Sequence, residues 1–478
     1  MPLRAVLIQP PETGGVRTLL PHFEDGMKAV GHKPPVGILS IATTLKERSC
    51  HEVFVIDAIA EGLTLDSLIR RVAALSPDVV GISAWTDFWY PAYRTGEGIK
   101  QSLPDTRIVF GGPHVGIFPA ETLAVPFVDA VVCGDGEIPF LHYCDMVAAE
   151  RLEDGVPGLH LKPFGVQPES NTFYVEKELD GLPIIDRRLL PLGRYNSVLG
   201  RHARATTMIT SRGCPFRCSF CKLNFQKTLS RSAESVIEEF RAIHELGIRE
   251  VEIYDDTFTW SKKRLIEICQ GLIDTGLNKK VEWAVRDRVN SPATKLYPLM
   301  RRAGCRRIHL GIESGVQRVI DCMNKRITLE QATAAVAGAK RAGLTVLTYF
   351  MFGNAEESLE DMLTTVDFAL SLRSDYAEFS ITIPYPGTEM YQEALSTGAI
   401  AEDFWRRHAH SPVPDVLPQV LESHVNLATM RDIQRRAIRS FYFRPRQLAK
   451  EAMSLRNPAV FLRKARMGAR LYQSVYRR

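Results

Sequence analysis

Short apolar segments alternate with longer amphipathic ones along most of this 478-residue chain, and this alternation constrains the fold more than any other feature. In the first third of the chain, the apolar segments are the predicted strands 5–8, 52–56, 79–83, 107–110 and 130–133. Helical patterns separate these strands, as over residues 36–46, 65–74 and 93–102. Uniformly apolar strands separated by helices form parallel sheets that are covered by helices. Residues 1–150 are therefore predicted to form a doubly wound α/β domain.

A second alternating series begins at Thr206, after a Pro- and Gly-rich stretch over residues 151–205 that we interpret as a linker. Its predicted strands are residues 206–210, 250–254, 282–285, 307–311, 345–352 and 377–383. Six strand–helix repeats are fewer than the eight of a closed barrel. We therefore expect a partial (β/α)6 barrel over residues 206–395 and a helical, basic region over residues 396–478.

Charge is unevenly distributed along the chain. Residues 431–478 hold 14 Lys or Arg against two acids, a net charge of +12, which leaves −7 for residues 1–430. Residues 448–455 and 458–475 are predicted basic helices with interleaved apolar side chains. Such a segment suits peripheral contact with an anionic membrane surface. A helical lid over the barrel mouth, with a solvated basic face, is the alternative, and nucleic acid is not an expected partner.

Composition is that of a globular protein, with 45% hydrophobic and 24% charged residues. It excludes collagen-like, coiled-coil and wholly disordered chains. No apolar run reaches the roughly 18–20 residues that span a bilayer, and the N-terminus lacks the apolar region of a secretory signal. We expect a cytoplasmic protein, held at the inner membrane surface if the basic tail binds lipid.

Three of the nine cysteines lie within eight residues, as Cys214, Cys218 and Cys221. A disulfide framework is not expected in a large cytoplasmic chain. Three thiolates on one loop can bind three irons of a cubane cluster and leave the fourth iron open to a substrate. A zinc knuckle or free thiols are the alternatives, but a structural zinc site takes four ligands. The spacing therefore favours an iron–sulfur cluster.

The Cys-x3-Cys-x-Phe-Cys spacing follows the first strand of the second series and resembles the signature of the radical S-adenosylmethionine (SAM) superfamily, with Phe220 at its aromatic position. The resemblance implies that Cys214, Cys218 and Cys221 are the catalytic metal ligands of a [4Fe–4S] cluster. Its open iron binds SAM, and one electron from the cluster breaks the S–C5′ bond to give a 5′-deoxyadenosyl radical. An external one-electron reductant such as flavodoxin or ferredoxin is then an expected partner.

Polar residues close three of the following strands, where barrel enzymes place their sites. Asp255 and Asp256 stand in the place of the superfamily's Gly-Gly-Glu segment, which meets the methionine ammonium, although the usual glycines are absent. By the same resemblance, Arg286 faces the carboxylate or ribose of SAM, and Glu313 faces its ribose or amino group. Ordinary solvated loops are the alternative for each of these segments.

The N-terminal domain resembles the cobalamin-binding domain that precedes the radical barrel in one large class. Asp57 and Gly62 match the ends of its Asp-x-His-x-x-Gly motif, but Ile59 occupies the position of the cobalt-binding His. A hydrocarbon side chain cannot ligate cobalt, so a bound cobalamin would lack that lower ligand. The alternative is a domain that keeps the fold and binds no cofactor.

Further segments resemble the nucleotide-binding elements of the same cobalamin domain. Ser83 lies in the segment that lines the nucleotide tail of the cofactor. Gly111 and Gly112 form a paired-glycine turn that lets this tail approach the backbone, and Gly134 lies in the turn that ends the domain. His114, just after the paired glycines, is predicted either to approach the corrin or to cap a turn.

Taken with the order of the two domains, the resemblance implies a cobalamin-dependent radical SAM methyltransferase that methylates an unactivated carbon of a small-molecule substrate. A radical cyclase or rearrangement enzyme of porphyrin or lipid type, like the anaerobic magnesium-protoporphyrin ester cyclase, is the alternative. A methylthiotransferase is less expected, because Cys50, Cys133 and Cys144 lack the contexts of its second cluster. A noncatalytic iron–sulfur electron carrier would need neither the strand-end motifs nor a second cofactor domain.

Overall fold

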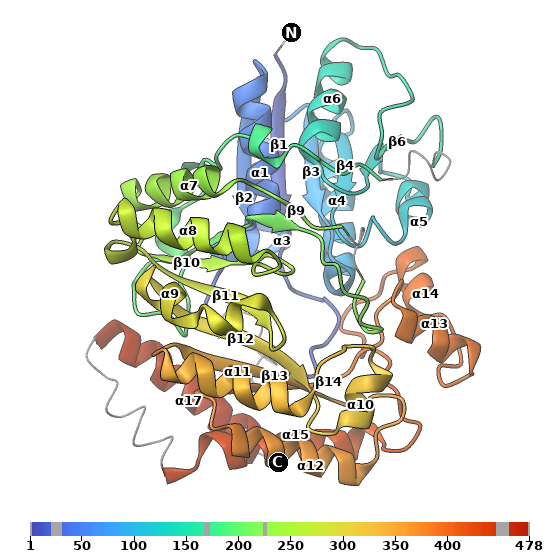
Figure 1. Cartoon of the computed structure of the whole chain (residues 1–478). Coiled ribbons are helices and arrows are strands. Elements are labelled where there is room, and N and C mark those ends of the chain that lie inside the picture. The colour runs from blue at the N-terminus through green and yellow to red at the C-terminus, as the bar shows by residue number, and fades with distance from the viewer. Residues whose placement is uncertain (1, 21–30, 167–172, 223–226, 446–457, 477–478) are drawn as a thin grey trace. The chain divides into compact units, whose positions relative to one another are not determined.

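The computed structural model describes residues 2–20, 31–166, 173–222, 227–445 and 458–476 (Figure 1). The chain divides into two compact units. The first comprises Met1–Arg17, His32–Tyr195 and Asp403–Leu417, and the second comprises Thr18–Gly31, Asn196–Glu402 and Pro418–Arg478. Each unit is described by itself below. The domain boundaries predicted at residues 150, 205 and 395 stay a prediction.

The first unit is built on a six-stranded sheet with the order β2-β1-β3-β4-β5-β6. Its strands are β1 (Arg4–Gln9), β2 (Glu52–Asp57), β3 (Val79–Ser83), β4 (Arg107–Gly111), β5 (Ala130–Val132) and β6 (Leu159–Leu161). The first five are parallel, and β6 is antiparallel to β5. Its longer helices are α1 (Val36–Arg48), α3 (Leu65–Leu75), α4 (Trp89–Ser102) and α6 (Glu137–Ala148). The predicted doubly wound parallel sheet is confirmed, while β6 arises in the stretch interpreted as a linker.

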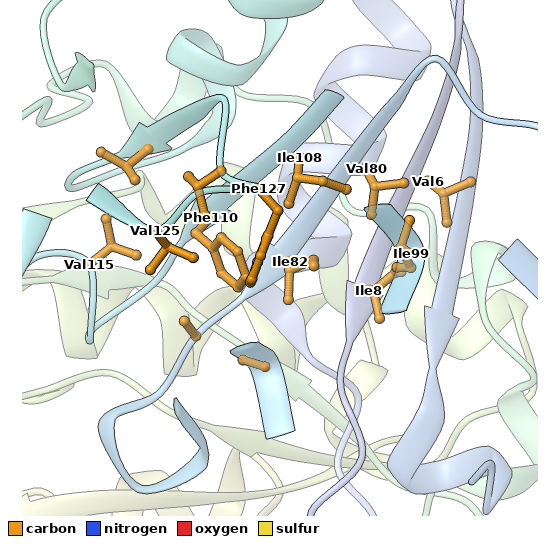
Figure 2. Close-up of a cluster of buried hydrophobic side chains, with 14 of the residues drawn as sticks. Val6, Ile8, Val80, Ile82, Ile99, Ile108, Phe110, Val115, Val125 and Phe127 are labelled. Carbon is orange, nitrogen blue, oxygen red and sulfur yellow. The ribbon is translucent and has the colours of Figure 1, made fainter. Parts of the chain in front are cut away.

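This sheet is buried on both faces, as its uniformly apolar strands predict. Figure 2 shows the cluster on one face, to which alternate strand residues contribute: Val6, Ile8, Val80, Ile82, Ile108 and Phe110. Intervening strand residues join a second cluster: Ala5, Leu7, Val79, Val109 and Val132. Each fully buried side chain of this size contributes about 1.5–3 kcal/mol. The two clusters thereby fix the positions of the strands and of their carboxyl ends. Open α/β sheets bind ligands at these ends.

The second unit contains a six-stranded, wholly parallel sheet with the order β14-β13-β12-β11-β10-β7. Its strands are β7 (Thr206–Met208), β10 (Glu250–Ile253), β11 (Glu282–Arg288), β12 (Cys305–Glu313), β13 (Thr345–Phe352) and β14 (Tyr376–Ile381). Its helices include α7 (Ala233–Glu245), α8 (Lys262–Asp274), α9 (Tyr297–Arg302), α10 (Gln317–Cys322), α11 (Leu329–Arg341) and α12 (Leu359–Leu372). Each of the six strands is followed along the chain by at least one helix, so the predicted partial barrel is confirmed.

Side-chain caps mark where the helices of this unit begin. Thr328 and Gln331 form a reciprocal capping box at the start of α11, and Ser358 and Asp361 form another at the start of α12. Such caps satisfy backbone N–H groups that have no partner within the helix. Each cap contributes about 0.5–2 kcal/mol and explains why the helix begins at that residue.

The two faces of this sheet differ in chemistry. Along β12, buried Ile308 and Leu310 alternate with Arg307 and His309. Because alternate side chains point to opposite faces of a strand, one face is apolar and the other is polar. Arg286 of β11 pairs in register with His309, so it belongs to the polar face. This polar face supplies the side chains of the site described below.

The last part of the chain is helical, as predicted. Its helices are α13 (Glu389–Ser396), α14 (Phe404–His410), α15 (Leu427–Tyr442) and α17 (Pro458–Tyr476). Helix α14 belongs to the first unit, where the Trp89 indole N–H donates to Ala409 O at 3.1 Å. The predicted helix 448–455 lies outside the described residues, and the one at 458–475 is confirmed as α17. Within the described parts of the chain, no helix is long and apolar enough to cross a bilayer.

Candidate functional site

The three cysteines lie on the loop that follows β7 and the short strand β8 (Ser211–Arg212). Cys214 and Cys218 are half-buried and Cys221 is exposed. The Cys221 N–H donates to Cys218 O at 3.0 Å, which folds the end of the loop into a turn. The Ser219 N–H also donates to Met323 O at 2.9 Å. The loop is therefore ordered by contacts with neighbouring segments of the second unit.

Asp255, just beyond β10, anchors the start of this loop. Its carboxylate accepts hydrogen bonds from the Thr210 N–H at 2.6 Å, from the Thr210 hydroxyl at 2.5 Å and from the Ser211 hydroxyl at 2.7 Å. Burial raises the pKa of Asp255, and these hydrogen bonds oppose that shift. Both carboxylate oxygens are engaged by the loop. The geometry thus gives Asp255 a structural task, and its predicted contact with a cofactor stays a prediction.

Asp256 occupies a different environment from its neighbour. Its Oδ2 accepts the Gly213 N–H at 2.9 Å, and its side chain reaches the surface. Gly213 has a φ of 84°, a conformation that favours glycine, and it directly precedes Cys214. Of the predicted acidic pair, Asp256 is the member with a carboxylate that is exposed beside the cysteines.

Two side chains that the sequence analysis did not single out contact cysteine sulfurs. Thr257 Oγ1 lies 2.9 Å from Cys214 Sγ. Arg288 Nη1, at the end of β11, donates to Cys218 Sγ at 3.4 Å. No motif of this sequence identifies these residues, because their roles arise from the position of each strand end beside the loop.

The aromatic residues of the loop lie against cations. The Arg288 guanidinium is 3.8 Å from the centroid of the Phe216 ring. The Lys325 ammonium is 5.4 Å from the centroid of Phe220, the residue at the aromatic position of the signature. These distances suit cation–π attraction. Phe220 therefore packs beside Lys325, and its predicted contact with a cofactor stays a prediction.

Glu313 ends β12 in a strained conformation. Its φ is 75°, which is rare for a residue with a side chain, and the register of β12 with β13 shifts at this point. The Glu313 carboxylate forms a buried ion pair with Lys325 Nζ at 2.5 Å. A Cβ on Gly311 would lie 2.5 Å from Glu313 Oε1, so only glycine leaves room for this carboxylate. Strain of this kind is typical of functional sites.

Arg286 lies on the polar face, with its guanidinium 4.0 Å from the centroid of the Tyr254 ring. Burial raises the pKa of Tyr254 to about 12, and the nearby Glu252 carboxylate adds to this increase, so its phenol is neutral at physiological pH. Arg286 thus lies two residues before the end of β11, rather than at its end as predicted, and Glu313 ends the adjacent strand β12. Their assigned contacts with SAM stay predictions.

A plug formed by the chain itself fills the amino-terminal end of the polar face. Arg307 forms an ion pair with Glu252 at 2.7 Å and donates to Leu199 O at 3.0 Å. The Ser197 hydroxyl donates to Glu252 Oε1 at 2.6 Å, and the Arg201 N–H donates to the neighbouring buried carboxylate of Glu250. Residues 197–201 thus satisfy this buried layer and leave the carboxyl ends of the strands as the reactive end.

The donor set of the cysteine loop fits an iron–sulfur cluster. Hydrogen-bond donors placed on ligand sulfurs stabilise thiolate charge, as outer-shell groups of metal sites do. Among the described residues, no three Cys, His, Asp or Glu side chains are arranged to hold a single metal ion. A cubane does not require such convergence, because each thiolate binds a different iron. Cys214, Cys218 and Cys221 are the residues that would hold the cluster.

In the first unit, Asp57 and Gly62 frame a single turn of helix, α2 (Ala58–Glu61). Asp57 caps it, accepting the Ile59 N–H at 3.1 Å and the Ala60 N–H at 3.0 Å, and its other oxygen accepts the Tyr195 hydroxyl at 2.9 Å. Burial raises the pKa of Asp57 against these hydrogen bonds. Gly62 ends the turn with a φ of 68°. Both residues thus shape this loop, and direct cofactor contact stays a prediction.

The remaining predicted cobalamin residues lie at the carboxyl ends of the strands. Ser83 and Gly111 are register partners at the ends of β3 and β4. A Cβ on Gly112 would lie 2.8 Å from Ala84 O, and a Cβ on Gly134 would lie 2.1 Å from the Tyr174 carbonyl oxygen. The chain's own backbone therefore already requires glycine at 112 and 134. Their predicted contact with a nucleotide tail stays a prediction.

His114 lies neither at the surface nor in a turn-capping position. Its ring is fully buried and stacks on Trp89 with centroids 4.2 Å apart. Its backbone N–H, rather than its ring, donates to Ala84 O at 3.0 Å. Within the described residues, neither of its ring nitrogens has a hydrogen-bond partner. The turn-capping alternative is therefore wrong for this side chain.

Two protein families match separate parts of the chain, one in each of its two predicted domains. Residues 208–369 match the Radical SAM superfamily, and residues 26–143 match the B12 binding domain. An uncharacterized methyltransferase of Pyrococcus horikoshii, PH0819, is 34% identical over 440 residues, 91% of this chain and 93% of that protein. The anaerobic magnesium-protoporphyrin IX monomethyl ester cyclase of Rubrivivax gelatinosus is 29% identical over 83% of this chain and 73% of its own.

Among solved structures, the radical SAM methyltransferase TsrM of Kitasatospora setae, with cobalamin and a [4Fe–4S] cluster bound, has a TM-score of 0.68. It is 19% identical and covers 84% of this chain and 76% of its own, which shows a shared fold. The two matched domains bring a [4Fe–4S] cluster, SAM and cobalamin as cofactors. With its 34% identity to PH0819 over nine-tenths of its length, the chain belongs to the radical S-adenosylmethionine enzymes that carry an N-terminal B12-binding domain.

Proposed function

We propose that this enzyme transfers a methyl group to an unactivated carbon of a small-molecule substrate. The observation that carries the proposal is the combination of a B12-binding and a radical SAM domain in one chain, together with 34% identity to a protein described as a methyltransferase. When bound, the cluster with SAM supplies a hydrogen-abstracting radical, and cobalamin supplies the methyl group.

The chain's own residues prepare the site for this chemistry. Asp255 fixes the cysteine loop by three hydrogen bonds, and the buried pair of Glu313 with Lys325 holds the strained end of β12. The plug of residues 197–201 closes the amino-terminal end of the polar face, which limits access of water from that side. Exclusion of water protects a reactive radical from side reactions. We assign contact with SAM to Asp256, Arg286 and Glu313 of this polar region.

A radical cyclase acting on the same cofactors is the second candidate. It is supported by the 29% identity to the cyclase of Rubrivivax gelatinosus over 83% of this chain. A methylase must consume SAM in two ways, giving S-adenosylhomocysteine from methyl donation and 5′-deoxyadenosine from radical formation. A cyclase needs only the second reaction, so the two products distinguish the candidates.

The test uses the full chain reconstituted anaerobically with iron, sulfide and hydroxocobalamin, then given SAM and dithionite. We expect both S-adenosylhomocysteine and 5′-deoxyadenosine to form. Formation of 5′-deoxyadenosine alone would favour the cyclase, and formation of neither would overturn both candidates. The Cys218→Ala chain serves as the control, because it should lose 5′-deoxyadenosine and still retain its corrin.

We also propose that α17 holds this cytoplasmic enzyme at an anionic membrane surface. Leu462, Tyr472 and Tyr476 are 49%, 56% and 46% exposed on this helix, and Arg466 of the same helix is exposed as well. Exposed apolar and basic side chains on one helix suit the headgroup region. Flotation with phosphatidylglycerol vesicles is expected for the full chain and not for a chain that ends at residue 457. Equal flotation of both chains would refute the proposal and leave the lid alternative.

A further inference from the structure

Arg288 brings a fixed positive charge to the cysteine loop. Its Nη1 donates to Cys218 Sγ at 3.4 Å, and its guanidinium lies over the Phe216 ring at 3.8 Å. Its Nη2 donates to the main-chain oxygen of Lys325, and its Nε donates to Asn290 Oδ1 at 3.3 Å. The side chain is only 8% exposed. These contacts hold the guanidinium in one orientation toward the sulfur.

Among the described residues, no carboxylate contacts the Arg288 guanidinium directly. In the part of the chain that the structure describes, the Arg288 guanidinium forms no ion pair with an Asp or Glu. Asp287, its neighbour in the chain, directs its carboxylate to the hydroxyls of Thr259 and Ser291 instead. Asp287 still interacts with the Arg288 charge through space, but the guanidinium itself contacts the Cys218 sulfur.

Cys214 has a donor of its own in Thr257. Thr257 Oγ1 lies 2.9 Å from Cys214 Sγ and 2.8 Å from Asp256 O, and the Thr257 side chain is buried. A thiolate can only accept hydrogen bonds. A carbonyl oxygen also only accepts, so when Cys214 is a metal-bound thiolate, the single Thr257 O–H proton is shared between Cys214 Sγ and Asp256 O. Thr257 is therefore a weaker donor to its sulfur than Arg288. Two of the three cysteine sulfurs thus lie beside a hydrogen-bonding side chain, one at the end of β11 and one in the loop after β10.

We propose that Arg288 and Thr257 are positioning residues that raise the reduction potential of the cluster. Reduction adds one negative charge to a cluster already held by three thiolates. A nearby buried cation and hydrogen bonds to the sulfurs stabilise the more negative, reduced form. The cluster can then accept its electron from a weaker reductant than it would otherwise need. Arg288 has the larger effect, because it combines a full charge with a hydrogen bond.

The test is an anaerobic redox titration of the reconstituted chain without SAM, with the reduced cluster measured by electron paramagnetic resonance. For Arg288→Gln we expect the ratio of reduced to oxidised cluster at a given potential to fall about tenfold, which is about 59 mV for one electron. For Thr257→Val we expect a smaller fall in the same direction, and for Thr257→Ser a return to the wild-type ratio. Arg306→Gln is the matched control, because Arg306 pairs with Glu282 at the amino-terminal ends of the strands, away from the cysteine loop.

Iron content per chain is measured alongside the potential, so that loss of the cluster is not mistaken for a shift. If Arg288→Gln and Thr257→Val carry wild-type iron and their ratios stay within twofold of the wild type, the proposal is overturned. If Arg288→Gln does not retain iron, the Thr257→Val and Thr257→Ser pair decides. An unchanged ratio in Thr257→Val overturns the proposal in that case as well.

Discussion

Two buried histidines are expected to make the first unit sensitive to mild acid. His114 stacks on Trp89, and His408 of α14 stacks on Phe404 with centroids 5.9 Å apart. Burial, together with the neighbouring His408, lowers the pKa of His114 to about 3. Burial, together with the neighbouring Arg407, lowers the pKa of His408 to about 4. Both rings are therefore neutral in the folded unit at pH 5.

The magnitude follows from the difference between folded and unfolded pKa values. In the unfolded chain each histidine has an ordinary pKa of 6.5. The stability that the neutral rings contribute is complete above pH 6.5 and is lost as the pH falls toward the folded pKa values, because only the unfolded chain takes up protons in this window. Lowering the pH from 7.5 to 5.0 costs about 2 kcal/mol for each histidine, or about 4 kcal/mol for the pair.

The assay is urea unfolding at pH 7.5 and 5.0 for the wild type, His114→Phe and His408→Phe, since Phe preserves the ring stacking. Other groups titrate over this range, but they cancel when the pH-dependent losses of two chains are compared. Between pH 7.5 and 5.0, each variant is expected to lose about 2 kcal/mol less stability than the wild type. His142→Gln, at an exposed position, is the control and should lose as much stability as the wild type. Hydrogen exchange of peptides from β4 and α14 assigns the transition to the first unit. Equal losses in wild type and both variants would refute the reasoning.

Two further substitutions test the second unit. Asp255→Asn leaves buried donors of the cysteine loop unpaired, which costs about 1–3 kcal/mol of stability for each donor. The iron content of the reconstituted chain should therefore fall, whereas Asp256→Asn should bind iron as the wild type does. Equal iron in the two variants would contradict the role of Asp255 as the anchor of the loop. Gly200→Ala places a Cβ 2.3 Å from the Glu250 carboxylate. This substitution should lower the free energy of unfolding by about 1–3 kcal/mol, measured by thermal unfolding. Gly193→Ala should not lower it, because a Cβ there has no neighbour within 4 Å. Unchanged unfolding of Gly200→Ala would contradict the close packing of residues 197–201 against this carboxylate.

Much of the fold was predictable because its signals are local. Strands such as β3 and β13 are runs of apolar, β-branched or aromatic residues, and their predicted bounds agree with the structure residue for residue. Strand β6 was missed because its sequence, Leu159–Leu161, has only three residues and includes a buried His. The membership of α14 in the first unit could not be predicted, because it depends on packing between Trp89 and Ala409, 320 residues apart.

The candidate site was predictable only where its signal is local to one segment of the chain. The cysteine loop is identified by its own spacing, and the binding of a cluster by Cys214 and Cys218 stays a prediction. Arg288, Thr257 and Lys325 were not found, because nothing in their neighbouring residues distinguishes them from ordinary strand-end polar groups. Their contacts arise only when strands and loops far apart in the chain meet at one edge of the sheet. Tertiary placement, rather than local sequence, decides which polar residues contact the cysteines.

The central claim is that one chain holds both a radical-generating cluster and cobalamin. The most direct measurement is the iron and corrin content of the reconstituted, desalted chain, with 5′-deoxyadenosine formation from SAM after reduction. We predict about four irons and about one cobalamin per chain, and 5′-deoxyadenosine that disappears in Cys218→Ala while the corrin absorbance remains. Absence of corrin after desalting, or of 5′-deoxyadenosine from the iron-loaded chain, would contradict the account.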